Sequence, residues 1–155
     1  MKEGTHFTAS ALIVYRDTVL LHRHEKIGLV LPLGGYIEEG EIPEEAVIRE
    51  VKEESGLDIQ VIDSARTARA HNLDDGTWHQ ANPGMTLARI ESRPGVVMLD
   101  FTFAAVCDDI STLGTGEVKK EHFVFLDEEE LKNYPDIKEN VRYYGAQALR
   151  MAREI

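Results

Sequence analysis

The chain has 155 residues, of which 43% are hydrophobic and 29% charged, proportions that are ordinary for a globular protein. Its net charge of −11 at pH 7 disfavours nucleic acid as a partner, because phosphate-backbone binding relies on Lys and Arg. The N-terminus has no apolar signal region, and the run from Ala11 to Leu21 is too short to cross a membrane. We therefore expect a single cytoplasmic domain over residues 1–155, without a membrane partner. Cys107 is the only cysteine, so an internal disulfide is excluded and a buried, inert thiol is expected.

The N-terminal elements read as strands. Residues 6–15 are rich in β-branched, aromatic and small residues, and Arg16-Asp17 should turn this strand into a second one over residues 18–24. A further apolar run at 28–33 leads into Gly34-Gly35.

A short acidic helix is predicted after this glycine pair. Pro43 suits the first helical position, and Ile42 should be extended because it precedes a proline. Gly56 is a natural left-handed stop. At about 100° per residue, Val47 and Val51 mark the buried face of this helix, flanked by Ile48.

The same rotation places three carboxylates on one arc beside the valines. Glu50, Glu53 and Glu54 share this arc, and Glu54 intrudes on the apolar side. Their mutual repulsion costs roughly a few tenths of a kcal/mol per pair. A hard cation such as Mg²⁺ would offset it, because Mg²⁺ binds carboxylates together with substrate phosphates and water. The alternative is a solvated acidic face.

The C-terminal half predicts a larger strand and a final helix. Residues 57–70 alternate moderately, and 71–94 form a polar connection with a turn signal at Asp75-Gly76. Residues 95–107 are the most strand-like stretch and should be central, followed by a short strand at 123–126. Asp127 should cap a helical turn, and the pattern Val141, Tyr144, Ala148, Met151 or Ala152, Ile155 predicts a last helix from Ile137 onwards. A mixed sheet with few helices favours an α/β sandwich.

The glycine loop and the acidic helix together carry a motif at fixed spacing. Its nine positions are Gly35, Glu41, Arg49, Glu50, Val51, Glu53, Glu54, Gly56 and Leu57. This pattern resembles the Nudix box of MutT-like hydrolases. The resemblance implies an α-β-α sandwich and Mg²⁺- or Mn²⁺-dependent hydrolysis of a nucleoside diphosphate linked to another moiety. The chain departs from the family pattern at Leu33, where a proline is usual, and at Ile42, where a hydroxyl residue often caps the helix.

The resemblance also implies roles for individual residues. Glu50, Glu53, Glu54 and the carbonyl of Gly35 would bind the metal, and Glu50 is one candidate for the general base. Arg49 would orient the acids and tie the helix to the loop at Glu41. The base could instead come from a later loop, where Glu117 and Glu121 are the candidates.

The substrate is less defined by the sequence. Trp78 and Arg89 lie in the polar connection and are candidates for substrate contacts, since long connections often form binding loops. Trp78 could stack on a base or fill the core. A nucleoside triphosphate is favoured over a nucleotide sugar. His22 and His24 share a strand face that could suit zinc, but no third ligand stands at a supporting spacing.

Two other classes of function compete with the enzyme. One is a nucleotide-sensing module without turnover, and the other is an interaction protein whose acidic helix only keeps it soluble. The sequence leaves a homodimer open.

Overall fold

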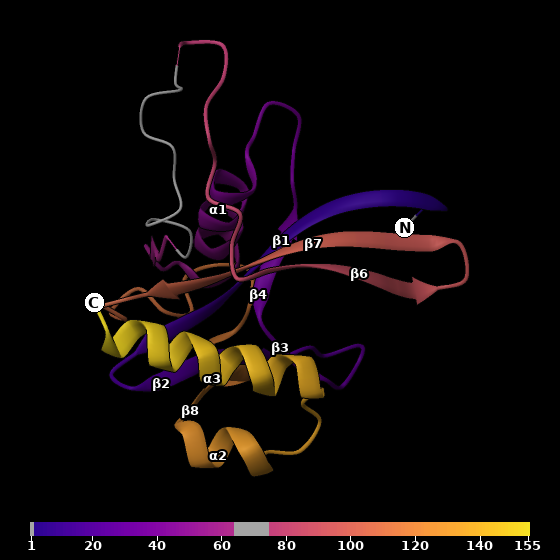
Figure 1. Ribbon diagram of the computed structural model, residues 1–155. Coiled ribbons are helices and arrows are strands. Elements are labelled where there is room, and N and C mark those ends of the chain that lie inside the picture. Colours follow the sequence, from indigo (N-terminus) through magenta and orange to yellow (C-terminus); the bar gives the residue numbers. More distant parts are fainter. Residues whose placement is uncertain (1, 64–74) are drawn as a thin grey trace.

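The computed structural model describes residues 2–63 and 75–155. Figure 1 shows the elements in chain order. They are β1 (Gly4–Tyr15), β2 (Thr18–Arg23), β3 (Val30–Leu31), β4 (Leu33–Tyr36), α1 (Pro43–Ser55), β5 (Gln60–Val61), β6 (Thr86–Arg93), β7 (Val96–Val106), the 3₁₀ helix η2 (Lys120–His122), β8 (Phe123–Leu126), α2 (Glu128–Asn133) and α3 (Glu139–Arg153).

Strand β1 is the hub of the mixed sheet. It pairs antiparallel with β2 and β4 and parallel with β7 along eleven residue pairs. The predicted β1–β2 hairpin is confirmed: Arg16 and Asp17 both have positive φ, as the two central residues of a hairpin turn require. Strand β7 is central, as expected, because β6 and β5 also pair with it.

Alternate residues of β1 serve two separate cores. Ala11 packs in the cluster that contains Val47 of α1, whereas its neighbour Leu12 packs with Leu149 of α3. Successive side chains of a strand point to opposite faces, so α1 and α3 cover opposite faces of the sheet. Figure 1 shows α3 and α2 together on one side, away from α1. The expected α-β-α sandwich is confirmed.

One strand was missed, and two predicted stretches form strands over only part of their described residues. The stretch 86–93, predicted as part of a polar connection, forms β6 and turns into β7 through Pro94 and Gly95. Within 57–70, only Gln60–Val61 is a strand in the part that the structure describes, and residues 64–70 lie outside it. The single apolar run predicted at 28–33 is divided at Pro32, which lacks an N–H for a ladder.

The buried face of α1 differs in part from the prediction. Val47 and Val51 are buried as predicted, but Ile48 is 41% exposed and Ala46 is the additional buried residue. In α3, Val141 and Ala148 are buried as predicted.

The end of α3 differs from its predicted pattern. Ile155 is 71% exposed, because α3 ends at Arg153, and Leu149 carries the packing instead. The cysteine prediction is confirmed, since Cys107 is a buried free thiol.

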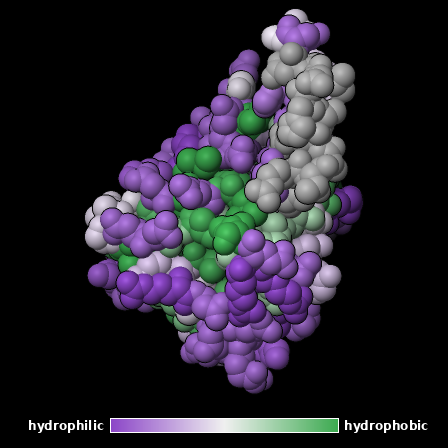
Figure 2. Space-filling view, turned by 60° about the vertical axis from the view of Figure 1, so that its left-hand side comes forward, coloured by the Kyte–Doolittle hydropathy of each residue, from purple (hydrophilic) through white to green (hydrophobic). Residues whose placement is uncertain are grey.

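The surface combines charged areas with a hydrophobic one. Figure 2 shows a green, hydrophobic area framed by hydrophilic side chains. Extensive areas of this kind often mark surfaces that bind a ligand or another protein. The homodimer that the sequence leaves open stays a prediction. Among the described residues, none of the helices has the length and apolar character needed to cross a membrane.

Candidate functional site

Helix α1 begins and ends where the local sequence predicts. Ile42 is extended at φ −84° and ψ 160°, and Pro43 is the first helical residue. The side chain of Ile42 cannot cap the helix, but its backbone N–H donates to Oε1 of Glu45 at 3.0 Å. Gly56 stops the helix at φ 85° and donates its N–H to the Lys52 carbonyl at 2.9 Å. These ends fix the rotational setting of the acids.

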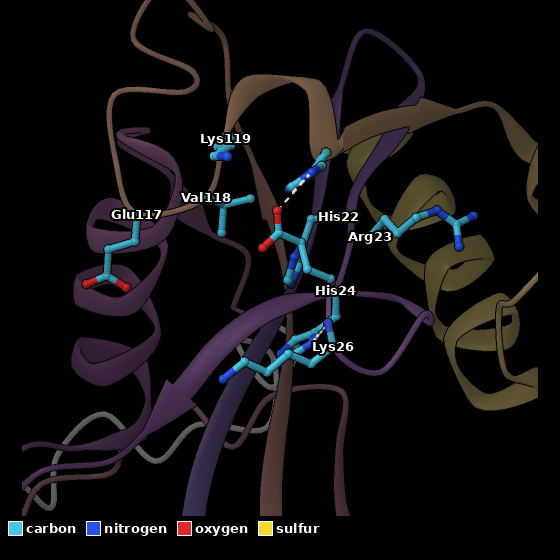
Figure 3. Close-up of a pocket in the computed structure, with 9 residues that line it drawn as sticks. His22, Arg23, His24, Lys26, Glu117, Val118 and Lys119 are labelled. Carbon is cyan, nitrogen blue, oxygen red and sulfur yellow. Dashed lines mark hydrogen bonds and ion pairs between the residues drawn. The ribbon is translucent and has the colours of Figure 1, made fainter.

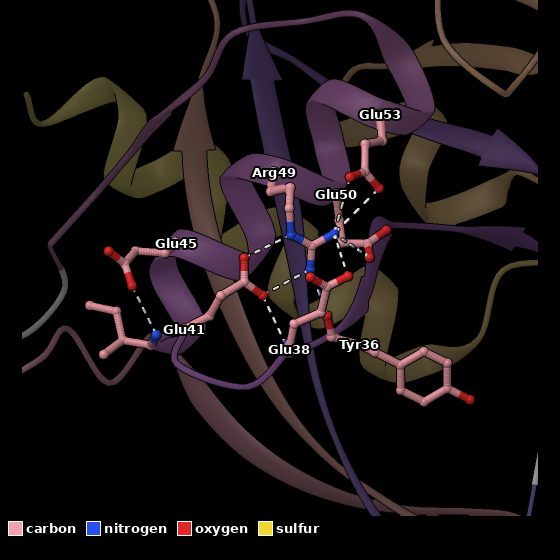
Figure 4. Close-up of polar contacts among 8 residues, drawn as sticks. Tyr36, Glu38, Glu41, Glu45, Arg49, Glu50 and Glu53 are labelled. Carbon is pink, nitrogen blue, oxygen red and sulfur yellow. Dashed lines mark hydrogen bonds and ion pairs between the residues drawn. The ribbon is translucent and has the colours of Figure 1, made fainter.

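One guanidinium group organises the acidic face of α1. Arg49 donates from Nε and Nη2 to both carboxylate oxygens of Glu41, at 2.7 and 2.9 Å, and from Nη2 to the Tyr36 carbonyl at 3.0 Å. Its Nη1 donates to Glu50 at 2.9 Å and to Glu53 at 3.3 Å. Figure 4 shows these carboxylates converging on the guanidinium. Arg49 therefore ties α1 to the preceding loop at Glu41, as the sequence predicted.

The ion pair between Arg49 and Glu41 shifts the pKa of both groups. The Arg49 guanidinium, together with the backbone N–H of Glu38, lowers the pKa of the Glu41 carboxyl to about 2. The same contact raises the pKa of Arg49 above its ordinary value. A bidentate arginine–carboxylate pair of this kind fixes orientation as well as charge. Glu41 is thus a brace for Arg49, and its own oxygens are occupied.

Glu54 has a different environment from the other acids. It is half-buried, and its Oε1 accepts the backbone N–H of Gly34 at 2.8 Å. Burial raises its pKa to about 7, and the nearby charges of Glu50, Glu117 and Glu53 add to the rise although the Gly34 bond opposes it. In the absence of a cation, Glu54 therefore exchanges a proton near neutral pH.

Two glycines allow strand β4 to approach the helix and β1. A Cβ on Gly35 would lie 2.4 Å from the carboxyl carbon of Glu50, so Glu50 rests directly on the glycine backbone. A Cβ on Gly34 would lie 2.2 Å from the carbonyl oxygen of Ala9 in β1. Gly35 thus leaves the space in which the Glu50 carboxylate lies, and Gly34 allows β4 to approach β1.

A later segment is bonded to the C-terminal end of α1. The N–H groups of Glu117 and Val118 donate to the carbonyls of Glu53 and Glu54, both at 2.9 Å. Gly116 permits this contact, because a Cβ there would lie 2.4 Å from the Glu53 carbonyl oxygen. Glu117 is close enough to raise the pKa of Glu54. Glu121 lies further along the chain in η2 and is exposed.

The candidates for substrate contacts lie outside this cluster. Trp78 is 48% exposed, so the alternative that it fills the core was wrong. Its backbone N–H donates to Asp75 at 3.0 Å, within the bend that Asp75 and Gly76 form. Arg89 is on the strand β6, where it pairs with Glu91 at 3.3 Å. Residues 71–74 of the predicted connection lie outside the described residues.

The donors around α1 suit a hard cation. Glu50, Glu53 and Glu54 offer carboxylate oxygens, and Gly35, which lies against Glu50, offers a backbone carbonyl. Carboxylate and carbonyl oxygens are the ligands that Mg²⁺ prefers. Within residues 2–63 and 75–155, no three His, Cys, Asp or Glu side chains are arranged around one point as metal ligands. Arg49 holds Glu50 and Glu53, while Glu54 is bonded to Gly34.

A histidine-lined hollow of about 270 Å³ lies beside the 117–122 segment. His22 from β2 and His24, just after that strand, line it, and His122 joins them from η2. Sequence reasoning missed His122, because antiparallel pairing of His22 with Phe123 brings it close and no local signal encodes that register.

Comparisons with known proteins agree with this architecture. The family model of the NUDIX domain matches residues 4–144. The crystal structure of a NUDIX-family hydrolase from Clostridium perfringens is 32% identical, covers 95% of this chain and 97% of its own, and superposes with a TM-score of 0.84. A search of curated proteins found no match.

Two more distant solved structures show the same fold. They are a C. elegans Ap4A hydrolase binary complex, at 15% identity, 96% coverage of both chains and a TM-score of 0.64, and the MutT protein from Methanosarcina mazei Go1, at 18% identity, 99% and 97% coverage and a TM-score of 0.62. The fold and the family match place the chain among hydrolases that act on phosphorus-containing anhydrides. More narrowly, it belongs to the Nudix family.

Proposed function

We propose that the protein hydrolyses the pyrophosphate bond of a nucleoside diphosphate linked to another moiety, in the presence of Mg²⁺ or Mn²⁺. A nucleoside triphosphate or related nucleotide is the favoured substrate. The observation that carries the proposal is the arrangement of Arg49, which holds Glu50 and Glu53 beside the half-buried Glu54. A helix made only for solubility would not need a buried carboxylate bonded to a strand.

The roles of the residues follow from their contacts. Glu50, Glu53, Glu54 and the Gly35 carbonyl would hold the cation, and a bound cation would supply an activated water and stabilise charge on the phosphoryl oxygens. Arg49 keeps the carboxylates oriented, since its other side is fixed to Glu41. Glu54 would be kept ionised by a nearby positive charge, because an opposite charge lowers the pKa of a carboxyl.

Hydrolysis also requires a general base near this cluster, which accepts a proton from the attacking water. Of the two loop candidates, we favour Glu117 over Glu121, because the Glu117 backbone is bonded to α1 and its charge is felt at Glu54. Glu50 is the second candidate, since its carboxylate contacts Arg49 and rests on Gly35. We therefore expect Glu117→Gln and Glu50→Gln to change the pH profile of kcat to different extents. Loss of the general base should remove the fall of kcat at acidic pH, so the variant without that fall identifies the base.

A panel of nucleotides tests the proposal. The purified protein is incubated with Mg²⁺ and nucleoside triphosphates, nucleotide sugars or dinucleoside polyphosphates, the last chosen because one structural neighbour is an Ap4A hydrolase. We expect release of phosphate or pyrophosphate, or of two nucleotides, that stops when EDTA is added. Metal-dependent nucleotide binding without any product would favour the alternative, a nucleotide-sensing module without turnover. Undiminished activity after exhaustive EDTA treatment would contradict the cation requirement.

A further inference from the structure

The histidine-lined hollow is formed by two segments that are far apart in sequence. His22, His24 and Lys26 come from β2 and the connection after it, and Glu117, Lys119 and His122 come from the segment before β8. Figure 3 labels His22, His24, Lys26, Glu117 and Lys119 around the hollow, with Glu117 on the side of α1. The hollow opens to solvent, and two of its lining residues, Glu117 and Val118, are also bonded to the end of α1.

Some charged side chains around the hollow form ion pairs and others do not. Glu25 pairs with His122 at 3.3 Å, and Arg23 turns away to Asp136 at 3.1 Å. Within the described residues, Lys26 and Lys119 have no carboxylate within ion-pair distance. The lining carries three basic side chains, Arg23, Lys26 and Lys119, and two carboxylates, Glu25 and Glu117, so the two lysines without acidic partners give it a small positive excess. Such a concave site attracts anions.

The histidines add hydrogen-bond donors to this potential. Nδ1 of His24 accepts the N–H groups of Lys26 and Ile27, both at 3.3 Å, so a neutral His24 carries its proton on Nε2. Burial and the neighbouring His24 lower the pKa of His22, which keeps its ring neutral. The described side chains here offer no three-ligand arrangement for a metal. Ammonium and imidazole N–H groups are instead the donors that bind phosphate oxygens.

The hollow is connected to the acidic cluster through the backbone. Glu117 lines the hollow, and its N–H is bonded to the Glu53 carbonyl at the end of α1. The next residue, Val118, lines the hollow and is bonded to the Glu54 carbonyl. A substrate that extends from the carboxylates past Glu117 would therefore bring its far end to Lys119 and Lys26.

We propose that this hollow is an anion subsite, which binds a phosphate group of the substrate beyond the bond that is cleaved. The inference rests on the proposed function and narrows its substrate class. Nucleotides that carry a further phosphate on the far side of the cleaved bond fit the subsite. Nucleotide sugars do not, because the phosphate released with their second moiety carries a sugar where a nucleoside triphosphate carries a further phosphate.

Direct binding tests the subsite without any turnover. Histidine ring resonances are followed by NMR while inorganic phosphate is added to the metal-free protein in EDTA. We expect saturating shifts for His22, His24 and His122 and none for His6, which bonds to the Lys2 carbonyl near the N-terminus. The double variant Lys26→Met, Lys119→Met should bind phosphate at least about tenfold more weakly, because it loses two charged donors.

Lys120→Met is the matched control for the single variant Lys119→Met. Each removes one positive charge, and Lys120 lies against Gly114 outside the hollow. Equal phosphate affinity in Lys119→Met and Lys120→Met, or the absence of saturating shifts, would overturn the proposal.

Kinetics separate a substrate phosphate from free phosphate as the ligand. In the double variant, KM for a nucleoside triphosphate should rise about tenfold while kcat changes little, and KM for a nucleotide sugar of the same base should not change. Equal effects on both substrates would contradict the assignment of the subsite to a substrate phosphate. If no nucleotide is hydrolysed, the proposed function fails, and the phosphate titration still decides whether the hollow binds anions.

Discussion

The backbone N–H of Gly34 donates to Oε1 of Glu54 at 2.8 Å, across twenty residues of sequence. This bond joins strand β4 to the acidic helix α1 at a half-buried carboxylate. The next residue of the strand, Gly35, lies against the carboxylate of Glu50. Two adjacent glycines therefore set the positions of two acids from the same helix. The geometry of the site depends on the backbone of β4 as much as on the acids themselves.

The two glycines should respond differently to alanine. In Gly35→Ala the Cβ meets the Glu50 carboxylate, so activity should fall at least about a hundredfold with less than about 1 kcal/mol lost from the free energy of unfolding. In Gly34→Ala the Cβ meets the backbone of Ala9, so the free energy of unfolding should fall by about 1–3 kcal/mol. Gly40→Ala is the control: its Cβ has open space, so activity should be retained, but φ +86° at Gly40 disfavours alanine, so about 1 kcal/mol should be lost from the free energy of unfolding. Denaturation curves and turnover that rank Gly34 and Gly35 the other way would contradict this account.

Arg49 should contribute to stability as well as to activity. Arg49→Ala removes the fork to Glu41 and leaves Glu50 and Glu53 without their cation, so we expect a loss of about 1–3 kcal/mol in the free energy of unfolding. Arg49→Lys keeps the charge but not the bidentate geometry, so it should recover part of the stability and little of the activity. Urea denaturation and kcat/KM measure the two effects. If Arg49→Lys matches the wild type in both, a plain surface charge would be sufficient.

The raised pKa of Glu54 predicts a pH effect in the metal-free protein. Between its ordinary value of 4.5 and the folded value of about 7, the folded protein retains a proton that the unfolded chain has lost. The free energy of unfolding should therefore fall as pH rises through this window, by about 1–3 kcal/mol for a half-buried group, and stay level above it. Glu54→Gln removes this term, so the stability difference between variant and wild type should grow from pH 4.5 to pH 7. A difference that is constant with pH would contradict the assigned pKa.

Exposure of Trp78 allows a test of the substrate-contact hypothesis. Trp78 is 48% exposed and could stack on a base when nucleotide is present. We expect its fluorescence to change on adding a substrate with Mg²⁺, and Trp78→Ala to raise KM more than it lowers kcat. Arg89→Ala is the parallel test for β6. Unchanged fluorescence with a verified substrate would remove Trp78 from the binding surface.

Local sequence signals were sufficient to predict helix α1 and the β1–β2 hairpin. Pro43 and Gly56 fix the ends of α1 through backbone preferences alone, and the spacing of Arg49 from Glu41 suggested the brace that the structure shows. The hairpin at Arg16 and Asp17 was likewise a short-range feature. Predictions succeeded where the interacting groups lie within one or two adjoining elements.

Features that depend on distant pairing could not be predicted. Strand β6 alternates weakly, and its pairing with β7 gives it its structure; the turn residues Pro94 and Gly95 were the available signal. His122 is a hundred residues from His22, and only the β2–β8 register brings them to one hollow. The contact of Glu117 with α1 depends in the same way on backbone bonds formed across the fold.

The central claim is that the acids of α1 are a cation site and not a solvated face. Its most direct test is the unfolding midpoint of the wild type, Glu53→Gln and Glu54→Gln, each with and without Mg²⁺, combined with turnover on the same samples. We predict that Mg²⁺ raises the wild-type midpoint by mass action and raises those of the variants less, while turnover falls strongly in both folded variants. Wild-type turnover in both variants, with equal effects of Mg²⁺ on all three midpoints, would contradict the cation site.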